Sequence, residues 1–385
     1  MSRSAKRAAR HPLLPRVRLY QTLRSAHLER AHQLEPASIV YQNKRYDFED
    51  PLTVGLDIRQ LGPLAGAWQL LRSPISTLEI NEPLMLSSLS TSALALIALT
   101  LRRATGRPRT SVVTYAIANS DPFAGGREPK HGLGLKRQAN RMLARRVWHR
   151  VDRAAFGTSA ARETYETVLG TVSLRSSALL FPALPAPFER AAACATPTRE
   201  PERVIFVGNF TDRKGVRQLL AAWPEVRKER PGADLVMVGK GRLTDEVMAA
   251  AQGDTGIHID LDPQRLEIHD LLDTAAVLVL PSQPSPAWRE QVGLPIVEGL
   301  SHGLTIVTTE QTGLAEWLDE NGHLVVHDPG SSSELSSAIV RALTAGLSPD
   351  DVLASLPARD GRLAADDWLF SRTPTISDLA RAFDG

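Results

Sequence analysis

Short apolar runs alternate along the chain with longer amphipathic stretches, and the alternation is most regular after residue 203. Apolar runs bounded by polar or Gly-containing turns predict buried strands, and the stretches between them have helical spacing. The alternation therefore predicts a parallel, doubly wound sheet covered by helices. Strands are expected at Val204–Val207, Asp234–Val238, Ile257–Ile259, Ala276–Leu280, Thr305–Thr308 and His323–Val326, with helices at Gly215–Arg230, Leu243–Ala251 and Ser333–Ala345.

The first half of the chain shows the same alternation in a looser form. Its first 35 residues are basic and predict helix, and the first strand is expected at Ala37–Tyr41. Further strands are expected at Thr77–Ile80 and Ser111–Tyr115. The uncharged run Leu84–Leu101 approaches the length of a membrane span, but five Ser and Thr in its first half favour a buried helix.

Composition indicates two domains. A chain of 385 residues is long enough for two separate cores, and a Pro-, Ala- and Thr-rich segment that ends at Glu202 is typical of a linker. We expect an N-terminal domain at 1–190, a linker at 191–202, and a Rossmann-like domain with a helical tail at 203–385. The single cysteine excludes an internal disulfide framework, and no metal-ligand cluster stands out among the histidines.

The net charge of +2 hides an asymmetry between the two halves. Residues 1–200 carry 29 Lys and Arg against 15 Asp and Glu (+14), whereas 201–385 carry 16 against 28 (−12), which sum to +2. The basic half, with a cationic helix expected at Leu135–Val151, predicts an anionic partner. A membrane surface fits better than nucleic acid, because no nucleic-acid motif is present and aromatic residues make up only 5%.

The basic start of the chain lacks the apolar core of a signal peptide. We therefore expect a cytoplasmic protein, with peripheral contact at the inner face of the membrane. The alternative for the basic residues is that they are solvated or bind a soluble acidic polymer.

The candidate site lies where the strand Ala276–Leu280 runs into a Pro/Ser-rich loop and a new helix. Pro295 fits the first turn of that helix, so free N–H groups face outward beyond the strand end. Glu290 and Glu298 frame this helix start. A helix N-terminus binds phosphate and carboxylates accept hydrogen bonds from sugar hydroxyls, a combination that suits a nucleotide-sugar. The alternative is two solvated carboxylates near a helix start, where acidic residues are favoured anyway.

A second candidate segment follows the strand Val204–Val207. Gly208 allows close approach of a ligand to the backbone, and the adjacent cations Arg213 and Lys214 suit a pyrophosphate. The alternative is a solvated pair of loop charges. A weaker Gly-x-Gly signal, Gly239 to Gly241, follows the next strand.

Glu290 and Glu298, separated by seven residues with Gly293-Leu294-Pro295 between them, resemble the E-x7-E signature of family-4 glycosyltransferases, glycosyl transferases group 1. The family has the GT-B fold, an α/β fold in which two Rossmann-like doubly wound domains face each other across a cleft. The resemblance implies that Glu298 binds the ribose and that Glu290 contacts the donor sugar. It also implies retention of configuration, no cofactor and no essential metal.

The resemblance assigns roles to further residues of the C-terminal half. Lys214 matches the family's diphosphate-binding Lys, and Arg213 is expected to replace an Arg where this chain has Asn209. The implied catalytic residues are Glu290, Lys214 and Arg213. The implied donor-binding residues are Gly208, Asn209, Gly239, Gly241, Gly293, Leu294, Glu298 and Thr308.

The N-terminal half departs from the family pattern. A His is expected after a central strand in many members, where this chain has Tyr115, and the family's Gly-rich loop is absent from the sequence. Tyr115 and Asn119 remain the acceptor-side candidates.

The expected function is transfer of a sugar, by a hexosyltransferase (EC 2.4), from a nucleotide-sugar to a glycan or lipid-linked acceptor of the cell envelope. The alternatives are a nucleotide-sugar epimerase, a glycosidase, and an inactive relative that binds a nucleotide-sugar as a partner subunit. A glycosidase would need no cationic loop aimed at a helix N-terminus, and the missing His favours the inactive relative.

Overall fold

The computed structural model describes residues 11–45, 48–124, 133–171, 177–189, 197–285 and 288–371. They form two compact units. Unit 1 contains the described residues within 1–157, 161–182 and 362–385, and unit 2 those within 158–160 and 183–361. The expected linker lies partly outside the described residues, at 190–196, as do most of the helical tail and the first ten residues.

Unit 1 is built on a seven-stranded parallel sheet with the order β3-β2-β1-β4-β5-β6-β7. The strand order reverses beside β1, because the chain adds β2 and β3 on one side of it and β4 to β7 on the other. The strands are β1 Arg16–Leu23, β2 Ser38–Lys44, β3 Asp57–Gln60, β4 Thr77–Glu79, β5 Ser111–Ala116, β6 Arg153–Phe156 and β7 Ser177–Leu180.

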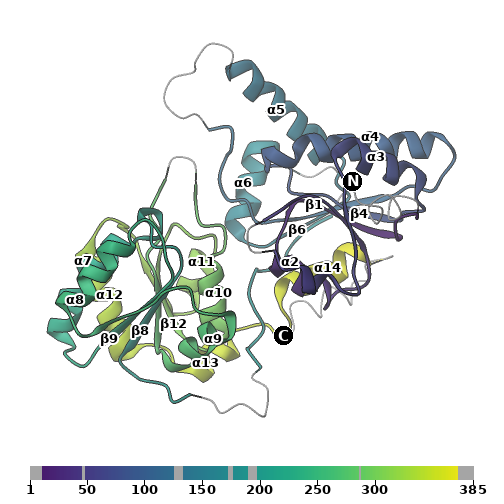
Figure 1. Cartoon of the computed structure of the whole chain (residues 1–385). Coiled ribbons are helices and arrows are strands. Elements are labelled where there is room, and N and C mark those ends of the chain that lie inside the picture. The colour runs from purple at the N-terminus through teal and green to yellow at the C-terminus, as the bar shows by residue number, and fades with distance from the viewer. Residues whose placement is uncertain are drawn as a thin grey trace. The chain divides into compact units, whose positions relative to one another are not determined.

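Helices cover both faces of this sheet (Figure 1). One face carries α3 Pro63–Arg72, α4 Leu89–Ala104, α5 Leu133–Trp148 and α6 Ser159–Leu169, which share an apolar core with the sheet. The other face carries α2 Ser25–Ala31 and α14 Gly361–Phe370, each over a smaller core. The helix expected in the uncharged run is α4, and within the described residues none of the helices combines the length and apolar character that crossing a membrane requires.

The prediction of helix in the first 35 residues is wrong for Arg16–Leu23, which form β1 in the interior of the sheet, whereas Ser25–Ala31 form α2. Arg18 made this segment resemble a polar surface, yet its side chain is buried. Arg18 Nη2 lies 2.8 Å from Asp366 Oδ2 and Arg18 Nε lies 3.4 Å from Glu79 Oε2. Two carboxylates thus compensate a charge that would otherwise oppose burial in the sheet.

The tail was assigned to the C-terminal domain, but from Arg362 onward the described residues of α14 belong to unit 1. Arg362 pairs with Glu79 and with Asp366 (3.4 Å), which closes a buried cluster of two arginines and two carboxylates with Arg18. Arg153 of β6 donates to the carbonyls of Trp368 and Leu369 at the end of α14. Ionic contacts and a cationic helix cap therefore attach α14 to the first sheet.

Unit 2 contains a six-stranded parallel sheet with the order β10-β9-β8-β11-β12-β13 and a single large apolar core. Its strands are β8 Arg203–Val207, β9 Asp234–Val238, β10 Ile257–Asp260, β11 Val277–Leu280, β12 Thr305–Thr309 and β13 Leu324–Val326. Its helices are α7 Val216–Glu229, α8 Thr244–Gly253, α9 Arg265–Thr274, α10 Leu294–Ser301, α11 Ala315–Glu320, α12 Ser332–Ala345 and α13 Pro349–Ala354. The doubly wound sheets expected for both halves are confirmed.

Candidate functional site

The loops after β8 and β9 meet backbone to backbone at the carboxyl ends of their strands. The N–H of Gly208 donates to the carbonyl of Val238 (2.9 Å), and a Cβ on Gly239 would lie 2.1 Å from the carbonyl oxygen of Gly208. Glycine is therefore required at Gly239 by contact with the neighbouring loop. Beside it, Asn209 and Gly241 extend the same edge. The sequence-predicted donor residues Gly208, Asn209, Gly239 and Gly241 thus lie together.

A short 3₁₀ turn, Asp212–Lys214, carries the two predicted cations towards the loop after β11. Gly215 ends the turn with φ of 72°, and a Cβ there would lie 1.9 Å from the carbonyl oxygen of Pro281. The N–H of Gln283 donates to the carbonyl of Arg213 (2.9 Å), which holds the two loops together. The close approach of this turn to the β11 loop therefore depends on glycine at position 215.

Lys214 forms an ion pair with Glu290, and both side chains are largely buried, with 10% and 14% exposed. The ring of Trp288 lies near both cations: the Arg213 guanidinium carbon is 4.5 Å from the ring centroid and Lys214 Nζ is 5.6 Å from it. The structure thus brings together all three predicted catalytic residues, Lys214, Arg213 and Glu290. Trp288 is a neighbour that sequence reasoning missed, although it lies two residues before Glu290.

Backbone contacts with the segment after β12 fix the position of Glu290. Its N–H donates to the carbonyl of Gln311 (3.0 Å), and its carbonyl accepts from the N–H of Gly313 (3.1 Å). The Thr312 hydroxyl donates to the carbonyl of Val292 (2.9 Å) in the same loop. Although the loop has no regular secondary structure, these bonds fix the backbone at Glu290.

Helix α10 starts directly beside Glu290. Gly293 precedes the helix with φ of 85°, and a Cβ on it would lie 3.4 Å from Glu290 Cγ. The first N–H groups of a helix have no intrahelical partner, and here they are those of the exposed Leu294 and the buried Ile296, because Pro295 has none. Glu298 follows within α10 and is half-buried. The helix start, one carboxylate and two cations therefore share one edge of the unit 2 sheet.

Thr308 differs from the other donor-side candidates because its side chain is fully buried. Its hydroxyl donates to the carbonyl of Leu280 (2.8 Å), which ties β12 to β11. The structure therefore gives this side chain a role within the sheet and leaves only the backbone around it near the ligand edge.

The two acceptor-side candidates lie at and beyond the end of β5 in unit 1. The Tyr115 ring lies 4.7 Å from the guanidinium carbon of Arg362, so Tyr115 faces α14, and Asn119 is almost fully buried. Sequence reasoning missed Glu82 nearby, whose carboxylate accepts from the N–H groups of Ile117 (2.9 Å) and Ala118 (2.8 Å). Burial raises the pKa of Glu82. The signal was present in the sequence, as an acidic residue directly after a buried strand.

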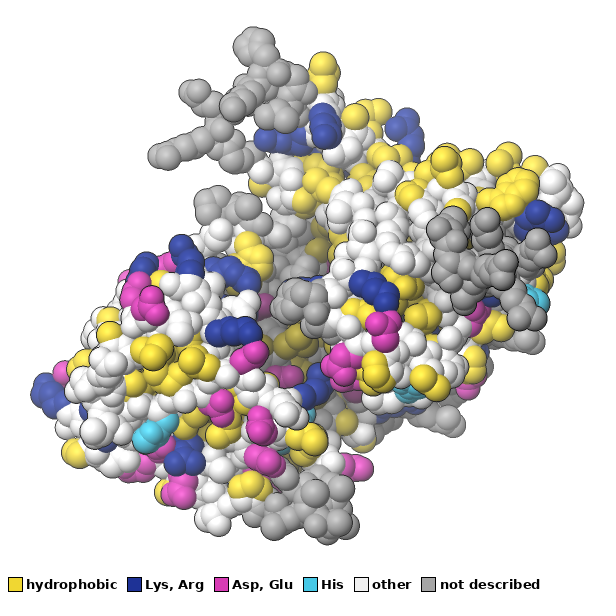
Figure 2. Space-filling model, viewed as in Figure 1, with side chains coloured by type: hydrophobic (Ala, Val, Ile, Leu, Met, Phe, Trp, Pro, Cys, Tyr) yellow, Lys and Arg dark blue, Asp and Glu magenta, His cyan; other side chains and the backbone are white. Residues whose placement is uncertain are grey.

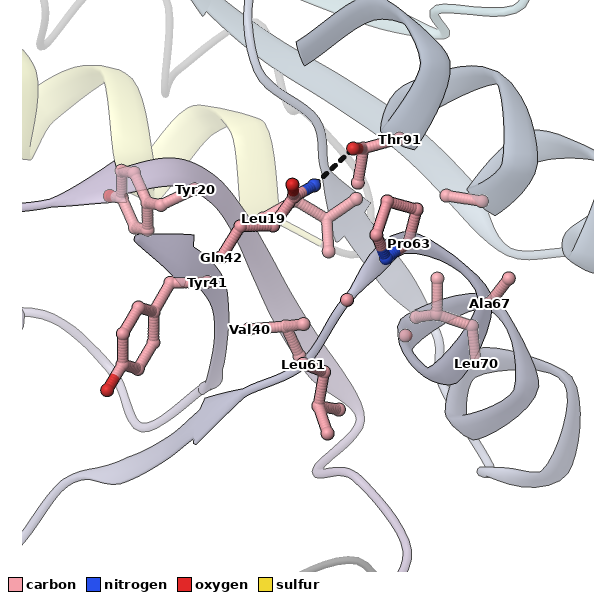
Figure 3. A pocket seen from close by; sticks show the side chains of 13 residues that line it. Leu19, Tyr20, Val40, Tyr41, Gln42, Leu61, Pro63, Ala67, Leu70 and Thr91 are labelled. Carbon is pink, nitrogen blue, oxygen red and sulfur yellow. Dashed lines mark hydrogen bonds between the residues drawn. The ribbon is translucent and has the colours of Figure 1, made fainter. Parts of the chain in front are cut away.

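A small pocket lies beside the middle of β1 and β2, between these strands and the helices α3 and α4. Figure 3 shows the Gln42 amide bonded to Thr91 on one side, with Pro63, Ala67 and Leu70 of α3 on the other. Gln21 Nε2 donates to Gln42 Oε1 (3.3 Å). The pocket has room for about one water molecule, so its neutral amide and hydroxyl groups can contact only single hydroxyl groups of a larger ligand. Nothing in the sequence pattern marked these residues.

Comparison with known proteins matches residues 201–345 to the family model of glycosyl transferases group 1. The glycogen synthase of Mycobacterium tuberculosis is 28% identical over 193 residues, which cover 48% of this chain and 43% of that protein. The lipopolysaccharide glucosyltransferase WaaG of Escherichia coli is 28% identical over 145 residues, 37% of each chain. The chain thus spans less than half the length of these curated relatives.

The crystal structure of Anabaena HepE in complex with UDP and glucose matches over 96% of this chain and 98% of that chain. The TM-score is 0.59 and the sequence identity 12%, so the likeness concerns the fold. It confirms the fold class expected from the sequence, the α/β fold of GT-B glycosyltransferases.

Proposed function

We propose that this chain, whose residues 201–345 carry a glycosyl transferases group 1 domain, is a glycosyltransferase that moves a hexose from a nucleotide-sugar to a glycan or lipid-linked acceptor. One observation supports the proposal above the others: the Lys214–Glu290 ion pair lies beside Arg213 at the start of α10. Two cations, a helix start and a carboxylate are the groups that a diphosphate joined to a sugar requires.

Transfer breaks the bond between the sugar C1 and the diphosphate oxygen, so negative charge develops on the leaving diphosphate. Lys214, Arg213 and the first N–H groups of α10 would stabilise that charge from fixed positions. Glu290 would contact the sugar hydroxyls and Glu298 those of the ribose. The proposal assigns charge neutralisation to these residues and includes neither a cofactor nor a metal, and it keeps the anomeric configuration of the donor.

In the structure, the Glu290 carboxylate forms an ion pair with the Lys214 ammonium group. A diphosphate brings more negative charge than one carboxylate and would compete for the ammonium group, releasing Glu290 towards the sugar. The ion pair would therefore keep both side chains in position in the empty site, at limited desolvation cost.

For the acceptor we propose unit 1, where Gln21, Gln42 and Thr91 offer neutral donors and acceptors beside the pocket. An uncharged sugar ring would satisfy them, whereas a phosphate would find no cation among the residues that line this pocket. The proposed acceptor position lies beside β1 and β2, in place of the sequence candidates Tyr115 and Asn119 on and beyond β5.

We also propose that unit 1 lies against the anionic inner face of a membrane. Helix α5 supports this, because Lys136, Arg137, Arg145 and Arg146 are exposed on it and it contains no acidic residue. Each cation near an anionic surface contributes about 1 kcal/mol, so four to six of them suffice for reversible binding. The protein would act in the cytoplasm as a peripheral enzyme.

Replacing Arg141, Arg145 and Arg146 together by Gln is expected to lower binding to anionic vesicles at low salt, because a large share of the attraction is Coulombic. Co-sedimentation over a series of anionic lipid fractions and salt concentrations measures the effect. The control removes three exposed cations from unit 2: Lys228, Lys240 and Arg265. Equal recovery of wild-type protein in the supernatant with neutral and anionic vesicles at low salt would contradict the proposal.

The donor site is tested by thermal shift with UDP-, GDP- and ADP-sugars, since a ligand of the native state raises the melting temperature. Lys214→Ala should weaken binding of the preferred nucleoside diphosphate about tenfold to a hundredfold, the loss expected for a charge-assisted contact. The loss should shrink at high salt, where the contact is screened. Lys228→Ala, which removes an exposed lysine paired with Glu225, is the control. Unchanged affinity of the Lys214 variant at low salt would show that the 3₁₀ turn only caps α7.

A further inference from the structure

Three helices of unit 1, α3, α4 and α5, contain neither Asp nor Glu. Helices α3 and α4 pack against each other and bury their inner faces over the sheet, through residues such as Leu70, Leu96 and Leu99. Their outer faces, which a protein in water would normally cover with charge, are instead partly apolar.

The outer faces carry four large apolar side chains that are more than half exposed. Leu64 and Trp68 of α3 are 76% and 56% exposed, and Ile97 and Leu101 of α4 are 55% and 54% exposed. Each pair has a spacing of four residues and therefore forms a row along its helix. We call these four residues the apolar ridge. Single exposed apolar residues are ordinary, but two rows on packed neighbouring helices mark an interaction surface.

Cations border the apolar ridge. Arg72 continues the α3 row by one further turn, and its guanidinium carbon lies 5.3 Å from the Trp68 ring centroid. Arg107 donates to the carbonyl of Leu71 at the end of α3 (3.0 Å). Figure 2 shows apolar side chains gathered over α3 and α4, with Lys and Arg at the ends of this region. The combination of apolar centre, cationic border and missing carboxylates complements a surface that is apolar inside and anionic outside.

We propose that the apolar ridge inserts into the interface of an anionic lipid bilayer, with Trp68 as its anchor. The indole suits the boundary between headgroups and acyl chains because it is apolar with one N–H, while Arg72 and Arg107 meet lipid phosphates. A second copy of the chain covers the ridge less well, because it would bring the same cations face to face. The inference rests on the proposed membrane-bound function and adds to it a lipid-inserted surface distinct from the charges of α5.

Fluorescence quenching tests insertion directly. Vesicles of phosphatidylcholine with phosphatidylglycerol, brominated along the acyl chains, quench a tryptophan only when it enters the acyl region. We expect quenching of the wild-type protein and its loss in Trp68→Phe, because Trp148, Trp223 and Trp368 are buried and the half-buried Trp288 and Trp317 belong to unit 2. Leu64→Gln with Ile97→Gln should lower the part of vesicle binding that survives high salt, several-fold. Leu266→Gln, at an equally exposed leucine of unit 2, is the matched control.

Two results would overturn the proposal. If the protein sediments with anionic vesicles but brominated lipid leaves its fluorescence unchanged, unit 1 binds by charge alone and the ridge does not insert. If the ridge substitutions abolish a dimer detected by light scattering and leave vesicle binding intact, a second copy covers the ridge. Nucleotide-sugar binding by thermal shift is measured on the same proteins. If the wild-type protein binds no nucleotide-sugar, the proposed enzyme function is wrong, but the insertion result still stands. If the ridge variants still bind the nucleotide-sugar, the donor site and the apolar ridge act independently.

Discussion

Glu298→Ala is expected to lower kcat/KM for sugar transfer on the order of a hundredfold or more while the protein stays folded. The proposed role of Glu298 is to accept hydrogen bonds from ribose hydroxyls, and two such bonds to a charged acceptor account for that loss. The side chain is only half-buried in α10, so its removal should cost little stability. Transfer kinetics with the preferred donor, together with the melting temperature, measure both effects.

Glu290 needs a different design because it pairs with Lys214. Glu290→Ala removes the proposed sugar contact and also leaves a largely buried ammonium without this partner, so loss of activity alone would be ambiguous. Glu290→Gln keeps the shape and a hydrogen-bond acceptor while it removes the charge. We expect both variants to lose transfer by a similar factor and only the alanine variant to lose clear stability. The control is Glu225→Ala, which removes an exposed glutamate of α7.

Near-normal turnover in a folded Glu298→Ala protein would contradict the assignment of the donor site.

Asp366→Ala is expected to destabilise unit 1 by about 3–5 kcal/mol, the cost of leaving a buried charge without its partner. Asp366 is 2% exposed and lies 2.8 Å from the Arg18 guanidinium, and Arg362 also faces it. Urea unfolding, followed by a probe in unit 1, measures the change. Asp50→Ala, which breaks the exposed Lys44–Asp50 pair, should cost less than about 1 kcal/mol.

A second variant tests whether the ion pair itself adds to the free energy of unfolding, or whether each buried charge only needs a partner of opposite sign. Arg18→Met combined with Asp366→Leu removes one cation and one anion together, and replacing a buried pair by apolar groups is often close to neutral. We therefore expect the double variant to be more stable than Asp366→Ala. An Asp366→Ala protein within about 1 kcal/mol of wild type would contradict burial of these charges.

The sequence predicted unit 2 well because its strands are nearly all apolar. Val277–Leu280 is fully buried on both faces, so its run of aliphatic residues has no other interpretation. Unit 1 was predicted less well because β1 includes Arg18. Nothing in the local sequence around Arg18 indicates that Asp366 will neutralise its charge. Contacts between residues so far apart in the sequence depend on the tertiary structure, and the pattern of one segment does not contain that information.

The same distinction between local pattern and tertiary contact applies to the residues of the candidate site. Glu290, Lys214 and Arg213 were candidates because they precede a helix start or follow a strand, and the resemblance to family-4 glycosyltransferases assigned their roles. The pairing of Lys214 with Glu290 came only from the structure. Gln42 and Glu82 were missed because isolated polar residues after strands are common, and only the fold places Gln42 beside Thr91. Thr308 was predicted from its position, but the direction of its side chain into the sheet is a property of strand register.

The return of α14 to unit 1 affects the order in which the protein becomes stable during synthesis. Arg18 and Asp366 are separated by 348 positions, and all the residues of unit 2 lie between them. All strands of the unit 2 sheet are therefore synthesised before Asp366, the partner of Arg18. Domains generally fold as units, the N-terminal one first during synthesis. Here we expect the reverse: the nascent first unit remains open to proteases until α14 has emerged.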